Sequence, residues 1–474
     1  MSSLCSPPLL PHARFELRDP MPPSSAAQPP DDRDLDRAIR DAIQHVADEL
    51  QSASLSIHGQ PELGWDEHHA HDVLTAFMEK QDGFSVTRHA YDLPTAWSAV
   101  FTSSASSSSG NDQIPTVGFN SEMDALKGLG HACGHNLISI AGCAAAVAVA
   151  RALEQFQLPG RVVLLGTPAE ESGAGKVRLL ERGAYDGLDA CLMVHPGKSG
   201  AGRHGAASVT TRCILGMSAE YVGVSAHAGG APEAAVNALD AAVVAYSAIS
   251  VLRQQLPPGV VVHGVIGGSE HWSSNIIPGK ARLEYGIRST SAATVASVLP
   301  RVLNCFEGAA TASGCRLSIE RTHFYLDVRP SRPLARAFDD FAQREWPADG
   351  GSSSDGGGYK VGQEQPTGAS TDFGNVSYRM PALHPMFLIP DAKPGDHPHS
   401  DTFADATKLP SSHDAALKAA SGIASAGLRV LISEEFRKEM RDAWEADVGE
   451  DEEVKAAVRK IDELLPDPRR TEPR

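Results

Sequence analysis

A chain of 474 residues is too long for one compact core, so we expect at least two domains. Its composition, 42% hydrophobic and 21% charged, is typical of a soluble globular protein, and its formal net charge of -17 disfavours nucleic acid or an anionic membrane as a partner. Seven cysteines without a CxxC pair or a regular spacing do not indicate a disulfide framework, which favours a reducing compartment, with the cytoplasm as the default.

The N-terminal part of the chain predicts an arm followed by two helices. Residues 1–30 are rich in Pro and Ser and lack an apolar core segment, which disfavours a secretory signal and favours disorder. A helix is expected over 31–51, where aspartates crowd the first turn and apolar residues recur at helical spacing. A second helix is expected over 66–80. The longest apolar run, 138–150, is too short to cross a bilayer, so no membrane partner is expected.

Strands and helices alternate from about residue 114. Apolar strands are expected over 114–119, 160–166 and 190–194, with helices over 137–155 and 175–182 between them. This alternation predicts an α/β fold with a mostly parallel sheet. In such sheets, ligand sites form at the carboxyl ends of the strands.

Side chains that bind metals follow each of these three strands. The segment 120–136 after the first strand contains two acids, two histidines and Cys133; Glu170 and Glu171 follow the second strand, and His195 follows the third. Thiolate, imidazole and carboxylate are ligands that zinc accepts. Each group also has a structural interpretation: a buried cysteine, a solvated helix start and a capped strand end. Their recurrence at successive strand ends favours the metal-site interpretation.

The pattern changes at about residue 211. Strand, helix, strand, strand, helix and strand follow one another over 211–323, which predicts a compact α/β two-layer sandwich inserted into the first domain. The first domain then comprises 31–210 and 324–434. Residues 435–474 are rich in charge and predict an exposed helical tail. Two segments read as low-complexity surface loops: the Ser-rich 103–110 and the Gly/Ser-rich 349–358.

Eight short motifs occur in a recognisable order: His-Gly-Gln-Pro-Glu-Leu (58–63), Gly-His-Ala-Cys-Gly-His-Asn (130–136), Pro-Ala-Glu-Glu-Ser-Gly (168–173), Val-His-Pro-Gly (194–197), Ala-His-Ala (226–228), Asn-Ile-Ile-Pro (275–278), Ser-Thr-Asp-Phe-Gly-Asn-Val-Ser (370–377) and His-Ser-x-x-Phe (399–403). With these motifs the chain resembles the two-metal aminoacylase/carboxypeptidase family, metallopeptidase family M20, from about Ile57 to Leu431. Within that family it is similar to the amidohydrolase branch that uses a cysteine ligand, and to the xaa-Arg-dipeptidase-like group.

The resemblance implies a fold and a set of site residues. The fold is a catalytic domain of the phosphorylase/hydrolase-like zinc-peptidase type, with the inserted domain serving for dimerisation or as a lid, and hence a homodimer. Glu170 corresponds to the general base. Five residues correspond to ligands of a divalent metal, two ions per subunit, zinc or manganese: Cys133, His135, Glu171, His195 and His399. His397 stays possible in place of His399.

Two residues of the inserted domain also have family counterparts. His227 corresponds to a histidine that reaches across a dimer to the carbonyl oxygen of the substrate, although a core histidine is the alternative interpretation. Asn275 stands where the family has a substrate-contacting asparagine. The chain departs from the branch at Lys127, where proline is usual, and at Asn136, where many members have aspartate.

Three further residues are candidates on their own chemistry. Asp124 is interpreted as a carboxylate that orients a metal ligand, with a turn residue as the alternative. Asp372 is interpreted as part of a substrate-binding, pocket-lining loop, with a helix cap as the alternative. Arg288 either forms a salt bridge in the lid or anchors a substrate carboxylate, and the sequence does not separate the two.

The hypothesis that follows is a metal-dependent hydrolase that cleaves the amide bond of a dipeptide or an N-acyl amino acid, with Glu170 acting on a metal-bound water. A non-catalytic, metal-binding accessory dimer on the same fold is one alternative, and amide condensation at the same site is another. The negative net charge is compatible with a cationic substrate.

Overall fold

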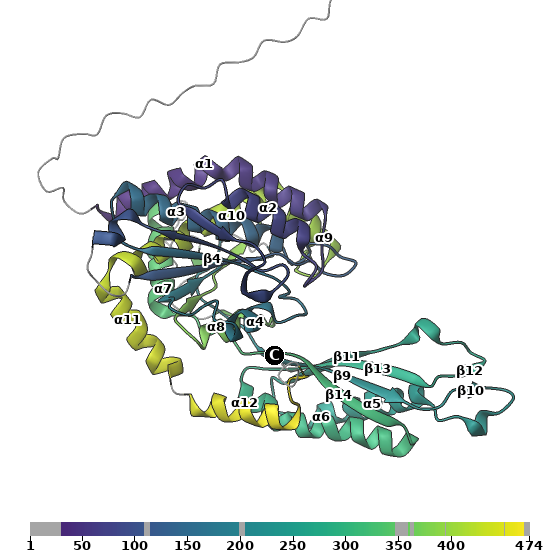
Figure 1. Ribbon diagram of the computed structural model, residues 1–474. Coiled ribbons are helices and arrows are strands. Elements are labelled where there is room, and N and C mark those ends of the chain that lie inside the picture. Colours follow the sequence, from purple (N-terminus) through teal and green to yellow (C-terminus); the bar gives the residue numbers. More distant parts are fainter. Residues whose placement is uncertain are drawn as a thin grey trace, which may run out of the picture.

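The computed structural model describes residues 30–108, 114–198, 204–346, 359–360, 365–393, 395–449 and 451–468. The chain forms two bodies, a larger main domain and a narrow inserted domain that projects from it (Figure 1). The N-terminal arm expected over 1–30 lies almost wholly outside the described residues, as do the Gly/Ser-rich segment 349–358 and the end of the Ser-rich segment 103–110.

The main domain is built on a six-stranded sheet of order β1-β2-β4-β3-β5-β17. The strands are β1 Phe84–Thr87, β2 Trp97–Thr102, β3 Thr116–Glu122, β4 Arg161–Thr167, β5 Ala190–Leu192 and β17 Ala382–Leu383. From β4 to β17 the pairs are parallel, whereas β1 and β2 add antiparallel pairs at one edge. The predicted α/β class with a mostly parallel sheet is therefore confirmed. β3 is buried at every position, because helices cover both faces of a parallel sheet.

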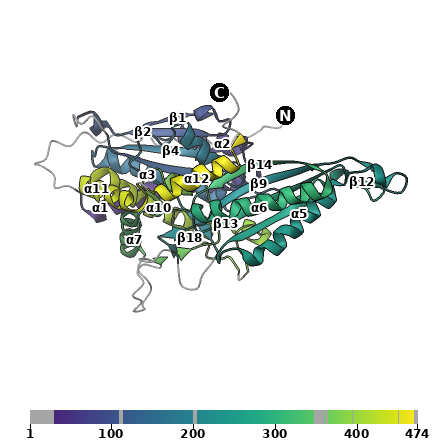
Figure 2. The same cartoon turned by 90° about the horizontal axis from the view of Figure 1, so that it is seen from below.

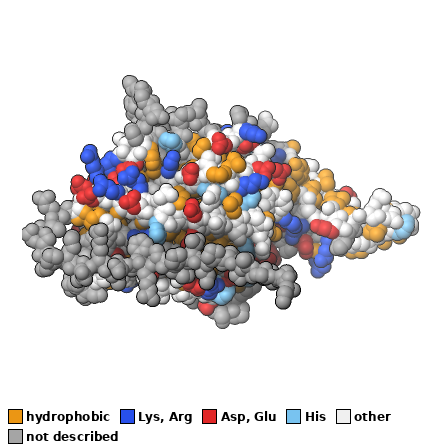
Figure 3. Space-filling model, turned by 90° about the horizontal axis from the view of Figure 1, so that it is seen from above, with side chains coloured by type: hydrophobic (Ala, Val, Ile, Leu, Met, Phe, Trp, Pro, Cys, Tyr) orange, Lys and Arg blue, Asp and Glu red, His pale blue; other side chains and the backbone are white. Residues whose placement is uncertain are grey.

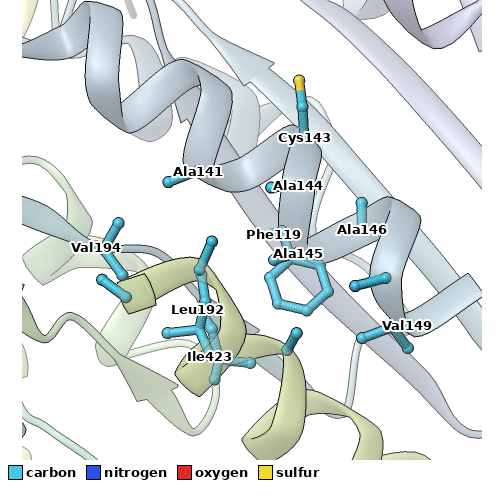
Figure 4. Packing of buried hydrophobic residues seen from close by; sticks show 14 of the residues in the cluster. Phe119, Ala141, Cys143, Ala144, Ala145, Ala146, Val149, Leu192, Val194 and Ile423 are labelled. Atoms are coloured by element: carbon cyan, nitrogen blue, oxygen red, sulfur yellow. The ribbon is translucent and has the colours of Figure 1, made fainter. Parts of the chain in front are cut away.

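One face of this sheet is covered by α1 (Asp32–Gly59), α3 (His135–Gln155) and α10 (Pro410–Ile432), which pack against one another. Figure 4 shows small side chains of α3 meeting Phe119 of β3 and Ile423 of α10. Although α3 and α10 are long and apolar enough to cross a membrane, 94% and 67% of their apolar windows are buried inside the protein. Both are core helices of this domain.

Shorter elements complete the main domain. The helices are α2 His68–Met78, α4 Gly175–Glu181, α7 Arg332–Glu345, α8 Phe373–Ser377 and α9 Asp401–Ala406. A small sheet of order β15-β7-β18-β6 joins β15 Tyr359–Lys360, β7 Gly205–Ala206, β18 Met386–Leu388 and β6 His195–Gly197, and β16 Gln365–Pro366 pairs with β8 Val209–Thr210. Because β6 continues the path of β5, it places His195 at the carboxyl end of the main sheet.

The inserted domain is a four-stranded antiparallel sheet of order β11-β13-β9-β14 with two helices on one face. Its elements are β9 Cys213–Val222, α5 Ala238–Leu252, β11 Val261–Gly267, β13 Lys280–Ser289, α6 Ala292–Ser313 and β14 Arg316–Tyr325. Alternate residues of β13, such as Leu283 and Ile287, enter the core beneath the helices. A short pair, β10 Ala226–His227 with β12 Ile276–Ile277, forms the tip farthest from the main domain (Figure 1). The predicted two-layer sandwich is thus observed.

The C-terminal segment returns from the main domain to the inserted domain. α11 (Glu434–Trp444) places Phe436 and Met440 in the main core, and α12 (Glu452–Leu464) packs along α6 (Figure 2). We call residues 434–468 the C-terminal strap.

Two kinds of contact attach the strap to the inserted domain. Ala457 and Ile461 are buried in the core of that domain. Arg321 of β14, itself buried, forms ion pairs with Asp462 at 2.7 Å and Asp467 at 3.4 Å. The tail is helical as expected, but the expectation that it is exposed is wrong, because its apolar residues recur on one face that packs against α6.

The molecule is elongated, and on the face in Figure 3 basic and acidic side chains are interspersed over the main domain. This face has no extended surface of a single charge sign. Such a mixture does not provide the continuous basic surface that binds a phosphate backbone.

Candidate active site

A cavity of about 460 Å³ lies between the carboxyl end of the main sheet and the inserted domain. On the main-domain side its wall contains Cys133, Glu170, Glu171, His195 and His399. The opposite wall comes from the sheet of the inserted domain and includes Arg288. Residues from separate segments of the chain therefore converge on one space, as ligand sites in α/β proteins do.

The tight loop before α3 positions the first two candidate ligands. Gly134 has φ +80°, and a Cβ atom there would lie 2.5 Å from Cγ of Pro196, so no other residue fits without a shift. The turn brings Sγ of Cys133 within 3.4 Å of Nε2 of His195. His135 begins the helix directly after the turn and is fully buried.

Asp124 orients two members of this cluster. Its Oδ1 lies 3.0 Å from Nδ1 of His135, and its Oδ2 accepts a hydrogen bond from the backbone N–H of Glu171 at 2.9 Å. With Nδ1 engaged, Nε2 of His135 is the atom that faces the cluster. This geometry agrees with the interpretation of Asp124 as an orienting carboxylate.

The structure separates His399 from His397. Nε2 of His399 lies 3.4 Å from Oε1 of Glu171, and its backbone N–H donates to the carbonyl of Ala132. His399 has φ +68°, a conformation that non-glycine residues adopt only when their surroundings hold them there. The Nδ1 atom of His397 lies beside the carbonyl oxygen of its neighbour, so His399 is the histidine that joins the cluster.

The residues of this cluster fit a metal ion. Donor atoms lie within 4.8 Å of one another in three overlapping groups: Cys133 with His135 and His195, Cys133 with Glu171 and His399, and His135 with Glu170 and Glu171. Nε2 of His135 and Oε1 of Glu171 are buried without a hydrogen-bond partner among the described residues and lie 3.9 Å apart. That separation suits two ligands of one ion with bonds of about 2.0–2.2 Å. Thiolate, imidazole and carboxylate together are a donor set suited to zinc and compatible with manganese.

The two adjacent glutamates differ in their electrostatic surroundings. Burial, reinforced by the charges of Glu122 and Glu171, raises the pKa of Glu170 well above its usual value. Burial also acts on Glu171, but His399 and His135 outweigh it and lower its pKa. The site therefore contains one carboxyl that favours holding a proton and one that favours the charged form, a division of roles common in active sites.

A buried ammonium group lies beneath this pair. Nζ of Lys176 is 2.6 Å from Glu122 and 2.5 Å from Asp372, and all three side chains are at most 1% exposed. The Lys176 backbone N–H also donates to Asp372. Asp372 thus lies below the cavity rather than on its wall, which differs from the interpretation as a substrate-binding residue. The reason is that its carboxylate pairs with a buried lysine that belongs to none of the sequence motifs.

Other functional candidates were not identified from the sequence. Buried Glu67 accepts a hydrogen bond from the backbone N–H of Ala169 at 2.7 Å, and burial followed by the charge of Asp124 raises its pKa to about 7. The hydroxyl of Tyr325 donates to the carbonyl of Glu170 at 2.8 Å. The only sequence signal for these residues is their proximity to the motifs, which does not reveal contacts.

His384 is a further candidate that the sequence did not indicate. It lines the cavity beside His195, and both of its ring nitrogens are buried without a hydrogen-bond partner among the described residues. Burial lowers its pKa to about 3, so the ring is neutral and can accept or donate a hydrogen bond within the cavity.

Arg288 lies on the wall opposite the cluster. Its guanidinium donates to Nε2 of His263 at 3.0 Å and to Oγ of Ser370 at 3.0 Å. Within the described part of the chain, no carboxylate forms an ion pair with it. Of the two sequence interpretations, the geometry favours a cation available to a substrate carboxylate over a lid salt bridge.

His227 and Asn275 do not meet the cluster within one chain. Both lie at the distal tip of the inserted domain, and neither lines the cavity (Figure 1). Nδ1 of His227 accepts hydrogen bonds from the backbone N–H groups of Gly229 and Gly230, so its ring proton is on Nε2. The exposed ring therefore presents a hydrogen-bond donor to whatever approaches the tip.

The fold and the site together define a class: a two-domain metallohydrolase that acts on peptide or linear amide bonds, with its ligands at strand ends facing a lid-like second domain. The model of Peptidase family M20/M25/M40 matches residues 117–420, and the chain belongs to this family.

Known proteins agree with this assignment. The chain is 36% identical to the Xaa-Arg dipeptidase of Homo sapiens, with 88% of this chain and 93% of that protein aligned. It is 29% identical to one of the two polypeptides of the p-aminobenzoyl-glutamate hydrolase of Escherichia coli (strain K12), over 66% of this chain and 67% of that polypeptide. The enzymatic assignment predicted from the sequence, a hydrolase of peptide or amide bonds, is confirmed.

Solved structures support the fold. An aminobenzoyl-glutamate utilization protein from Klebsiella pneumoniae superposes with a TM-score of 0.56 at 20% identity, covering 80% of this chain and 98% of that one. A dinuclear metal-binding peptidase of family M20 from Bacillus subtilis gives a TM-score of 0.54 at 18% identity, covering 82% and 99%. At these identities the likeness is one of fold.

Proposed function

We propose that this protein is a metal-dependent dipeptidase in which Glu170 is the general base. The observation that supports this most directly is the pairing of Glu170 and Glu171 beside the Cys/His cluster, with their pKa values moved in opposite directions. A carboxyl that favours its protonated form, held next to a set of metal ligands, is suited to receive a proton and pass it on.

The metal ligands in this proposal are Cys133, His135, Glu171, His195 and His399, holding zinc or manganese. Cys133 belongs to two of the overlapping donor groups, which supports two ions that share it. When bound, divalent ions polarise the amide carbonyl and lower the pKa of water.

The chain's own residues then carry the proton. Glu170 takes a proton from water as the water oxygen forms its bond to the carbonyl carbon. It delivers that proton to the amide nitrogen as the C–N bond breaks, so that the products are a carboxylic acid and an amine. Tyr325 and Asp124 keep the two glutamates pointing in different directions, because one binds the carbonyl of Glu170 and the other the N–H of Glu171.

Arg288 is the group that binds the free carboxylate of the substrate. It faces the cluster across the cavity and is fixed by His263 and Ser370. A guanidinium on the wall opposite the reacting centre suits a dipeptide or an N-acyl amino acid, both of which end in a carboxylate. The activities named for the relatives, cleavage of Xaa-Arg dipeptides and of p-aminobenzoyl-glutamate, concern substrates of this kind.

The functional unit in this proposal is a homodimer formed through the inserted domain. β11 is an edge strand of its sheet, and exposed apolar side chains cluster on α5 and β11: Val243, Val244, Tyr246, Val251, Val261 and Val265. An unpaired strand edge beside such a surface suits pairing with a second copy. Dimerisation would carry His227 of one chain to the carbonyl oxygen bound in the other.

The test is hydrolysis of dipeptides and N-acyl amino acids by protein that has been stripped of metal and then supplied with zinc or manganese. We expect activity to require the metal. Glu170→Gln should lower kcat by about 10²–10⁴-fold while metal content, measured by atomic emission, is unchanged. The matched control is Glu181→Gln on exposed α4, which should behave as wild type.

Two results would contradict the proposal. Turnover that persists in the chelated protein would remove the metal from the reaction. A Glu170→Gln variant with full activity would remove the general base.

A further inference from the structure

The wall of the cavity formed by the inserted domain contains a second charged group besides Arg288. Three carboxylates line the cavity among the described residues: Glu170 and Glu171 in the metal cluster, and Glu284 on β13. Glu284 is therefore the carboxylate that the cluster does not use. A carboxylate within a substrate cavity needs a cationic partner to offset the loss of its hydration.

The contacts of Glu284 leave room for such a partner. Oγ of Ser218 donates to its Oε1 at 3.2 Å, and Nε of Arg282 approaches the same oxygen at 2.8 Å. The second oxygen, Oε2, has no hydrogen-bond donor among the described residues. The pair with Arg282 is weak, because the two side chains are 56% and 39% exposed to water.

Glu284 and Arg288 are placed to hold the two ends of one residue. Both side chains stand on the same face of β13, four residues apart, which separates their Cα atoms by about 13 Å. The residue between them on that face is Gly286, opposite His263 on β11 and Gly216 on β9. Between the two charges the wall is formed by glycine backbone and imidazole rings, with no third charged side chain on β13.

The length of a basic amino acid matches this separation. An extended lysine residue spans about 7 Å from its carboxylate carbon to its ammonium nitrogen. A charge-assisted hydrogen bond of about 2.8 Å at each end brings its partners close to the spacing on the strand. Ile214, Met217 and Val265, which also line the cavity, provide apolar surface for the aliphatic part of the side chain.

We infer that Glu284 binds the cationic side chain of the residue whose carboxylate is held by Arg288, so that the preferred substrates are dipeptides ending in lysine, ornithine or arginine. This inference rests on the proposed function, because it assigns the substrate class of the same site. It makes Glu284 the residue that determines specificity.

The experiment compares alanyl-lysine with alanyl-norleucine, which has the same aliphatic chain without the ammonium group. We expect wild type to prefer alanyl-lysine in kcat/KM. Glu284→Gln should lower kcat/KM for alanyl-lysine by about 10–100-fold, mainly through KM, and leave alanyl-norleucine unchanged. Glu284→Lys should favour alanyl-glutamate over alanyl-lysine. The matched control is Glu220→Gln on β9, which removes the same charge from the same sheet outside the cavity.

A binding measurement separates failure of this inference from failure of the proposed function. Calorimetric titration of alanyl-lysine and alanyl-norleucine into zinc-loaded Glu170→Gln protein, with and without Glu284→Gln, reads recognition without turnover. Tighter binding of alanyl-lysine that disappears with Glu284 supports the inference even if wild type hydrolyses neither peptide. Equal binding of the two peptides, or an equal effect of Glu284→Gln on both, overturns it.

Discussion

Glu170 and Glu171 are adjacent in the sequence, and the backbone on either side of them explains how they come to differ. Ala169 and Ala174 have φ of +53° and +56°, in the left-handed region that non-glycine residues avoid at a cost of about 1–2 kcal/mol each. The turn persists because buried groups hold it. Glu67 binds the N–H of Ala169, and Tyr325 accepts the N–H of Ala174 at 3.2 Å.

Replacing Glu67 should change how stability depends on pH. The pKa of Glu67 is raised from 4.5 to about 7 in the folded protein, so the folded state favours the protonated carboxyl. The stability this provides is complete below about pH 4.5 and is lost as the pH rises through 7, by about 3 kcal/mol. Glu67→Gln stays neutral and should lack this loss. Urea unfolding of the metal-free protein between pH 5 and 8 measures the difference.

The control for this measurement is Glu49→Gln, an exposed glutamate of α1. Its unfolding free energy should follow that of wild type across the pH range. A Glu67→Gln variant that parallels wild type would show that Glu67 is charged in the folded protein throughout.

At the residue scale, the sequence predicts a ligand when the ligand follows a strand directly. Cys133, Glu171 and His195 were identified for that reason. Lys176 was not, because its significance comes from Asp372, far away in the chain, and from Glu122 on another strand. Such a contact exists only after the strands have been ordered in the sheet, and one sequence does not specify that order.

Among the elements, α3 is the helix on which the site depends, and its distance from the sheet is set by a glycine. A Cβ atom at Gly142 would lie 2.4 Å from the backbone oxygen of Asn120 on β3. The close approach places His135, at the start of the same helix, over the end of β3, where Asp124 binds it.

Gly142→Ala should therefore lower the free energy of unfolding by roughly 1–3 kcal/mol, because helix and strand must separate. Gly308→Ala is the matched control. Gly308 is an exposed glycine inside α6 with no atom within 4 Å of the added Cβ, and alanine there should raise stability by up to about 1 kcal/mol. Denaturant midpoints of the two variants should move in opposite directions; a shift of both to higher denaturant would show that β3 does not restrict α3.

Helix and strand types in both domains were predictable from apolar periodicity, whereas their ends were not. α1 continues to Gly59, well past the expected end at 51, because Ala53 and Ile57 extend its buried face. α3 begins at His135 rather than at 137, because the left-handed Gly134 starts the helix immediately after the ligand loop. In each case a tertiary contact, rather than local preference, decides where the helix ends.

For the whole molecule, the separation of His227 from the cavity leads to a prediction about two subunits. Glu170→Gln and His227→Ala should each be nearly inactive alone. When the two are co-expressed with different tags, about half of the dimers are mixed and each contains one complete site, so about a quarter of wild-type activity should return. Pairing Glu170→Gln with Cys133→Ser is the control, because no site in that mixture is complete. Activity that stays at the sum of the single variants would mean that His227 does not act across a dimer.

At this scale, the two-domain plan and the position of the insertion could be predicted, because the periodicity changes where the chain leaves the main sheet. The path of the strap could not. Its charged residues are typical of a solvated tail, and the apolar face formed by Val454, Ala457 and Ile461 gains its meaning only from α6 beside it.

The strap also imposes an order on the synthesis of the protein. Chains emerge from the ribosome N-terminus first, and domains fold as units as they appear. α6 is made well before α12, so the apolar surface that α12 covers has no partner until almost the last residues have been translated. The inserted domain is consequently the last part of the molecule to be finished, although its own sheet and helices lie in the middle of the chain.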